Sequence, residues 1–83
     1  MKLTKKQQEL VDLINNKQNE IGQKIYVRHF GHFGMCLIKV IDNIKCEIVQ
    51  SKINSKIIYA LLDKGVLTEE KLESNITLVG LNA

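Results

Sequence analysis

The stretch Asn54-Ser55-Lys56-Ile57-Ile58-Tyr59-Ala60-Leu61-Leu62-Asp63-Lys64-Gly65-Val66-Leu67 carries start and stop signals for a short helix that runs directly into a strand. Asn54 or Ser55 can cap the N-terminus, because a short side-chain oxygen accepts a hydrogen bond from the free backbone N–H groups of the first turn. Gly65 can end the helix, because glycine enters the left-handed conformation without a Cβ penalty. The stretch therefore predicts a helix over residues 54–64 and a strand that begins at Val66.

Apolar spacing gives this helix two different faces. One face is aliphatic and is expected in the core; it comprises Ile57, Ile58, Leu61 and Leu62. The opposite face is polar and largely basic; it comprises Lys52, Ser55, Lys56, Tyr59 and Asp63. The helix should therefore cover a core with one face and offer the other to solvent or a partner.

A longer helix is predicted upstream, over residues 4–21. Thr4 and Gln7 fit a capping box, in which each side chain satisfies the other residue's backbone donor, and Gly22 follows as a stop signal. Apolar residues recur at helical spacing along it, and the predicted buried stripe is Leu10, Val11, Leu13, Ile14 and Ile21.

Between the two helices the pattern changes to that of strands. β-Branched and aromatic residues predict strands over residues 24–30, 35–41 and 44–49. In the first, Ile25 and Val27 share one face, and Tyr26, Arg28 and Phe30 share the other. A helix over residues 35–41 is the alternative, disfavoured by the short length and the β-branched residues.

Two connections complete this prediction. Asp42-Asn43 suits a hairpin turn, because both residues tolerate positive φ. After the capped helix we expect a polar, acidic loop over residues 68–75 and a last strand over residues 76–79.

Length and charge limit the class of protein. The chain has 83 residues and a net charge of +3, which fits one domain over residues 1–83 with an anionic partner. Apolar runs are shorter than the roughly 20 residues of a membrane span, and the lysine-bearing N-terminus has no apolar segment of a signal peptide. With only two cysteines, the reducing cytoplasm is the expected location.

Two parts of the sequence have a family pattern. One is the opening, Leu3-Thr4-Lys5-Lys6-Gln7-Gln8-Glu9-Leu10-Val11-Asp12-Leu13-Ile14; the other is Ala60-Leu61-Leu62-Asp63-Lys64-Gly65-Val66, followed by Ile76-Thr77-Leu78. Both resemble the winged-helix superfamily. Within it they are most similar to the N-terminal DNA-binding domain of the LexA repressor family and to small phage and mobile-element proteins. The resemblance implies an α+β, winged-helix-like domain with an N-terminal helix, a recognition-like helix over 54–64 and a C-terminal two-stranded wing. A central β-hairpin stands where the family has its second helix.

The resemblance also implies a site. The helix over 54–64 would enter the major groove of double-stranded DNA. Its contacting residues would be Lys52, Ser55, Lys56 and Tyr59, with Arg28 as a further phosphate contact. The alternative is that these residues form an ordinary solvated helix face. The acidic segment Glu69-Glu70-Lys71-Leu72-Glu73 argues against a wing that touches phosphates.

A doubled His-Phe-Gly, His29-Phe30-Gly31-His32-Phe33-Gly34, is the second constellation. His29 and His32 could join Cys36 and Cys46 in a zinc site, although paired Cys-x-x-Cys spacing is lacking. Tyr26 and the two phenylalanines could instead stack on single-stranded nucleic acid beside Arg28.

The alternative for the doubled motif is a glycine-containing hairpin loop whose phenylalanines fold back on the core. Exposed Phe30 and Phe33 would instead suggest a protein-binding surface.

Two functions from different classes follow. The first is a DNA-binding transcriptional regulator or accessory factor of phage type, with a homodimer as the usual arrangement of such modules. The second is a protein-binding module, an inhibitor or adaptor that reuses the same scaffold; a structural subunit is a third. We expect no enzyme, no catalytic residue, no metal and no cofactor, because phosphate-binding and nucleophile motifs are missing from the sequence.

Overall fold

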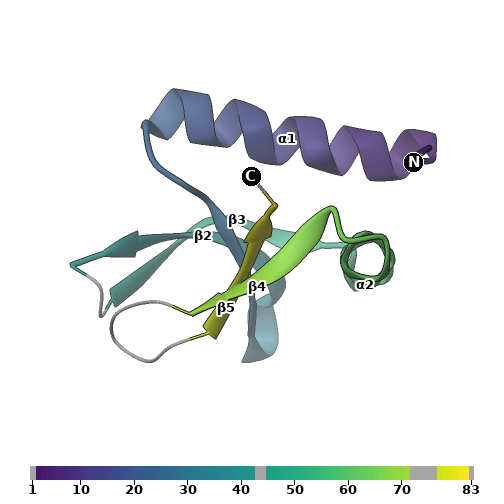
Figure 1. Ribbon diagram of the computed structural model, residues 1–83. Coiled ribbons are helices and arrows are strands. Elements are labelled where there is room, and N and C mark those ends of the chain that lie inside the picture. Colours follow the sequence, from purple (N-terminus) through teal and green to yellow (C-terminus); the bar gives the residue numbers. More distant parts are fainter. Residues whose placement is uncertain (1, 43–44, 72–76, 83) are drawn as a thin grey trace.

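A computed structural model describes residues 2–42, 45–71 and 77–82 of the chain. It is a small α+β domain in which one long helix lies along a five-stranded antiparallel sheet, and a second helix lies beneath the N-terminal end of the first (Figure 1). The elements are α1 (Lys5–Ile21), β1 (Tyr26–Phe30), a 3-10 turn (Gly31–Phe33), β2 (Gly34–Ile41), β3 (Lys45–Ile53), α2 (Ser55–Asp63), β4 (Leu67–Lys71) and β5 (Thr77–Leu81).

Local signals set the ends of α1. The Thr4 hydroxyl accepts from the Gln7 backbone N–H at 3.2 Å, and the Gln7 side chain accepts from the Thr4 N–H at 3.1 Å. Gly22 ends the helix in the left-handed conformation at φ 81°. The capping box and the stop signal are therefore confirmed.

The sheet has the order β3-β2-β1-β5-β4, with all neighbours antiparallel. Strands β1, β2 and β3 form a meander, and β5 returns to pair with β1, so that Val27 lies opposite Val79. The predicted strands between the helices are confirmed, and residues 35–41 are strand. β3 continues to Ile53 where the sequence predicted an end at Val49, because backbone pairing with β2 extends through the polar segment Gln50-Ser51-Lys52.

The predicted loop over residues 68–75 is wrong in its first half. Leu67–Lys71 is strand β4, at the edge of the sheet and paired along its length with β5. Its charged side chains made it look like a loop, yet charges are a usual feature of edge strands because they discourage pairing with other chains. Residues 72–76 lie outside the described residues, as does Asn43 of the predicted hairpin turn; Asp42 has the positive φ, 55°, expected there.

Each face of the sheet has its own apolar cluster. The inner cluster lies beneath the helices; it contains Leu10, Ile14, Ile25, Val27, Met35, Leu37, Ile58, Leu61 and Leu67. The outer cluster lies on the opposite face, where Phe30, Val40 and Cys46 pack against Tyr26, Cys36, Ile38 and Leu78. The predicted alternation of β1 is thus confirmed, and the sheet is buried on both faces at its centre.

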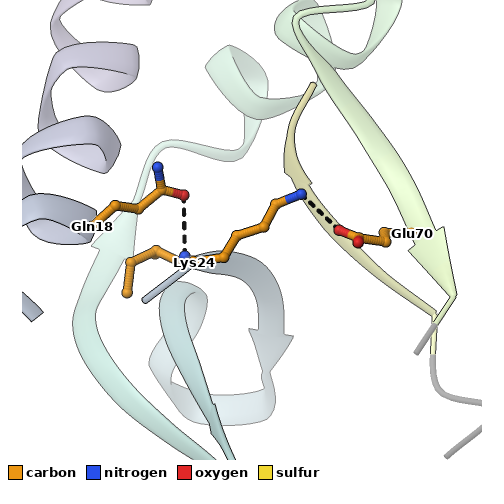
Figure 2. A network of polar contacts seen from close by, with 4 residues as sticks. Gln18, Lys24 and Glu70 are labelled. Carbon is orange, nitrogen blue, oxygen red and sulfur yellow. Dashed lines mark hydrogen bonds and ion pairs between the residues drawn. The ribbon is translucent and has the colours of Figure 1, made fainter. Parts of the chain in front are cut away.

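The segment between α1 and β1 is held from two sides (Figure 2). The Gln18 side chain of α1 accepts from the Ile25 backbone N–H at 3.1 Å, and the Lys24 ammonium lies 2.7 Å from a Glu70 carboxylate oxygen of β4. These contacts tie the long helix and the edge strand to the same point of the chain. Neither helix in the described part of the chain is long and apolar enough to cross a membrane.

Candidate nucleic-acid interface

The capped helix α2 forms as the sequence predicts. The Asn54 side chain accepts from the Lys56 backbone N–H at 2.9 Å, and Gly65 follows the helix at φ 77°. Ile58 and Leu61 are fully buried in the inner cluster. The helix therefore has one face fixed against the core, which leaves its opposite face outward.

That outward face carries the predicted contact residues. Lys52, Ser55, Lys56 and Tyr59 are all exposed, and Tyr59 is 62% exposed, an unusual value for an aromatic side chain. Ser55, Lys56 and Tyr59 belong to α2, whereas Lys52 precedes the helix near the end of β3 and lies at the groove between α1 and the start of α2. Asp63, at the other end of the same helix, is exposed as well.

Helix α2 crosses beneath the first turns of α1 (Figure 1), and residues next to each end of α2 approach that helix. At one end, the Lys64 ammonium donates to the Gln7 side-chain oxygen at 2.6 Å and to the Lys2 carbonyl at 3.3 Å. At the other end, Lys52 and Asn54 line a groove together with Lys6 and Glu9 of α1. Lys6 and Lys52 line this groove, and Lys64 contacts the first turn of α1. We call these three residues, together with the neighbouring exposed lysines Lys2, Lys5 and Lys56, the basic end.

The lysines of the basic end outnumber the carboxylates near them. Within the described chain, the first turns of α1 and α2 carry no Asp or Glu. The ion pairs formed by the described residues join Lys17 to Glu20, Lys24 to Glu70 and Lys39 to Glu47, so none of them involves a lysine of the basic end. Glu9, Asp12 and Asp63 are the carboxylates on the same two helices near this surface.

Arg28 lies elsewhere. Its guanidinium lies 5.4 Å from the centre of the Phe30 ring and 3.8 Å from the Cys46 sulfur, both on the outer side of the sheet. Helix α2 packs on the inner side, with α1 and β4 as neighbours. The structure therefore separates Arg28 from the other four predicted contact residues.

The two phenylalanines of the doubled motif have different environments. Phe30 is half-buried and packs against the outer cluster, as expected for a ring folded back on the core. Phe33 is 59% exposed on the 3-10 turn, so the same expectation is wrong for it. Gly34 follows the turn with a positive φ of 68°, a backbone conformation that suits glycine.

The four zinc-ligand candidates do not converge. Cys36 is buried in the outer cluster, whereas the neighbouring His29 is exposed and, by strand alternation, points to the other side of the sheet. Among the residues that the structure describes, no three His, Cys, Asp or Glu side chains lie close enough together to hold one metal ion.

A second polar cluster joins Lys24, Tyr26 and Glu70 on the outer side of the sheet. The Lys24 ammonium lies 5.5 Å from the Tyr26 ring centre. Its hydrogen bond to Glu70 lowers the pKa of that carboxyl below its usual 4.5. Burial, followed by the nearby Glu70 charge, raises the pKa of Tyr26 above 10.0. Gly80 lies under this cluster, where a Cβ atom would be 3.0 Å from the Lys24 side chain and 3.1 Å from the Tyr26 ring.

The sequence did not identify the contribution of α1 to the basic end. Its signal was present: Lys5 and Lys6 occupy the first turn of a well-capped helix, where acidic residues are usual.

Scans against protein-family models, curated proteins and solved structures each find no match to this chain.

Proposed function

We propose that the protein binds double-stranded DNA through the basic end, with α2 as the recognition helix of a winged-helix-like scaffold and with a regulatory or accessory role. The observation that carries the proposal is the position of the lysines. Lys5, Lys6 and Lys56 lie at the positive ends of two helix dipoles, where a basic side chain is unfavourable for stability and an acidic one is favoured. Phosphate groups bound there would compensate for that cost.

The outward face of α2 supplies suitable contact groups. Lys52 and Lys56 would neutralise phosphates, and Ser55 would donate to a phosphate or to a base edge. Tyr59 is exposed beside them and would contact the sugar-phosphate backbone through its hydroxyl. Arg28 stays outside this interface because it lies on the outer side of the sheet.

Titration of a labelled random-sequence duplex at low and at moderate salt tests the proposal. Affinity should fall steeply with salt, with a log–log slope of about 0.9 for each phosphate contact. The Lys56→Glu variant should bind more weakly and reduce that slope by about 1. Sedimentation of the complex would show whether two copies bind one duplex.

Lys45→Glu is the matched control. Lys45 is also exposed, but it begins the nine-residue strand β3, whose far end leads into α2, so it lies at the opposite end of that strand from the helix. Equal losses in Lys45→Glu and Lys56→Glu would show nonspecific attraction to net charge. No binding of the unmodified protein at low salt would refute the proposal.

A protein-binding module is the second candidate, and the exposed Phe33 favours it. A large aromatic side chain held outward on a turn is a usual anchor in protein interfaces. A pull-down from nuclease-treated lysate, compared with the Phe33→Ser variant, tests this function. A partner that both proteins retain equally would exclude Phe33 as its anchor.

A further inference from the structure

The groove between α1 and the start of α2 differs in chemistry from the outward face of α2. Its floor is aliphatic, formed by Leu10 and Leu13 of α1 with Ile53 and Ile57 from the other side. Leu13, Ile53 and Ile57 are only partly buried, so their free sides face the groove. An aliphatic floor is a poor surface for phosphate, because it offers no hydrogen-bond donor.

The rim of the groove is charged. Lys6 and Lys52 lie on opposite sides, and Glu9 lies three residues after Lys6 on α1. Residues three apart on a helix are neighbours, so Glu9 offsets Lys6, and the remaining positive charge is at the Lys52 side. There it adds to the positive end of the α2 dipole at Asn54.

The backbone of Lys52 has an energetically unfavourable conformation. Lys52 has φ 60°, the left-handed conformation that non-glycine residues rarely adopt. It belongs to a bulge: three steps along β3, from Gln50 to Ile53, match two steps along β2. The bulge turns Ile53 into the floor and leaves Lys52 at the rim, so the strained residue is one that shapes the groove.

The size of the groove limits its occupant. It encloses about 260 Å³, less than the roughly 300–1,000 Å³ of typical small-molecule sites. Such a space suits an aliphatic side chain or two presented by another protein. We infer that this groove docks an acidic peptide segment of a partner protein, with a leucine-type side chain on the floor and a carboxylate beside Lys52.

This inference goes beyond DNA binding and does not depend on it. It combines the anchoring of an apolar side chain in a groove between helices with charge complementarity at the Lys52 side of the rim. Lys56 and Tyr59 lie outside the groove lining. DNA binding and peptide docking can therefore fail separately.

Two-dimensional ¹H–¹⁵N NMR of the full chain tests the inference, because it detects millimolar affinities. The probe is a synthetic helical peptide of about 15 residues, long enough to hold helix in water, with two leucines one turn apart flanked by glutamates. The control peptide replaces both leucines with serine and keeps every charge. We expect saturable shifts at Leu10, Leu13, Ile53 and Ile57 with the leucine peptide and none that saturate with the serine peptide.

Two variants of the groove rim and one distant control make the test independent of folding. Lys52→Gly relieves the left-handed strain, so the fold is retained, but it removes the rim charge and should weaken docking about tenfold. Lys6→Gln, on an exposed side chain, should weaken it less, because Glu9 already offsets Lys6. Lys45→Gly, far along β3, should leave docking unchanged.

Several outcomes would overturn the inference. One is that the leucine peptide causes no shifts at millimolar concentration. Another is that the serine peptide causes shifts equal to those of the leucine peptide. A third is that Lys45 and Lys71 shift as strongly as the groove residues. Shifts of the floor residues with a short DNA duplex but not with the peptide would assign the groove to nucleic acid instead. Loss of DNA binding in Lys56→Glu with peptide docking intact would leave the inference standing.

Discussion

At the residue scale, the glycines of this protein and Lys52 occupy backbone positions that differ in the space and the φ angle they require. Gly80 is favoured by space, because a Cβ atom there would lie in tight contact with the Lys24 stem and the Tyr26 ring. Gly22 and Gly65 have open space around them and are explained by their positive φ values. Lys52 has a positive φ as well but is not glycine, and the groove lies beside this unfavourable backbone conformation.

The Lys24–Glu70 ion pair should make stability depend on acid pH. Because Lys24 lowers the folded-state pKa of Glu70 below 4.5, the pair contributes stability above the unfolded-state pKa and loses it as pH falls through the lowered folded value. The Glu70→Gln variant should therefore melt at a lower temperature than the unmodified protein near neutral pH. The difference in melting temperature should disappear below the folded-state pKa of Glu70, where its carboxyl is protonated and as neutral as the glutamine of the variant.

Thermal unfolding followed by circular dichroism across this pH range measures the effect. Glu69→Gln is the matched control, since Glu69 is the exposed neighbour on the same strand and has no ion pair among those between described residues. A Glu70→Gln deficit that stayed constant with pH would mean that packing, and not charge, is lost.

At the element scale, the parts of the fold that were predictable are those with local causes. The two helices were predicted because the capping residues Thr4 and Asn54 lie next to the backbone groups that they satisfy. The extension of β3 to Ile53 and the continuation of β4 from Leu67 to Lys71 depend on partner strands distant in sequence, and the polar residues of these segments gave no alternation to detect.

The same distinction holds for the candidate site. The outward face of α2 follows from helical spacing alone. The meeting of Lys6 with Lys52, and the separation of Arg28 from both, depend on how α2 crosses α1 and on which side of the sheet each strand residue faces. No pattern within one element contains that information.

Lys56→Glu should change stability and DNA binding in opposite directions. A carboxylate in the first turn of α2 interacts favourably with the helix dipole, so the free energy of unfolding should rise by about 0.3–1 kcal/mol at low salt. DNA binding should weaken, because a phosphate contact is replaced by a repulsive charge. Urea unfolding and duplex titration of the same preparation measure both quantities.

Opposite signs of the change in unfolding free energy and the change in DNA affinity would show that Lys56 serves binding and not stability. Lys56→Gln, which removes the charge without adding a carboxylate, should lie between the unmodified protein and Lys56→Glu on both scales. If Lys56→Glu lowered stability, the helix-dipole argument for a functional role of these lysines would be wrong.

At the scale of the whole molecule, the two helices and the sheet divide the surface into regions of different chemistry. The basic end lies where α2 crosses the first turns of α1, as Figure 1 shows for the elements. The paired carboxylates Glu20, Glu47 and Glu70 lie on α1, β3 and β4, each beside its own lysine. Among the described residues, the lysines of the basic end form none of these ion pairs, and Glu9, Asp12 and Asp63 offset only part of their charge. That asymmetry is a property of the fold, since a net charge of +3 alone would be modest.

The two proposed surfaces share Lys52, which predicts competition between them. A peptide seated in the groove would place its carboxylate beside Lys52 and oppose a phosphate at the same point, so bound peptide should lower the affinity for DNA. Fluorescence anisotropy of a labelled duplex, titrated with the leucine peptide and the equally charged serine peptide, measures this. The leucine peptide should displace DNA at concentrations where the serine peptide does not. Lys52→Gly should reduce that difference while DNA remains partly bound through Lys56. Equal displacement by both peptides would mean that the groove plays no part, and a stable complex of protein, peptide and DNA would show that the two surfaces are independent.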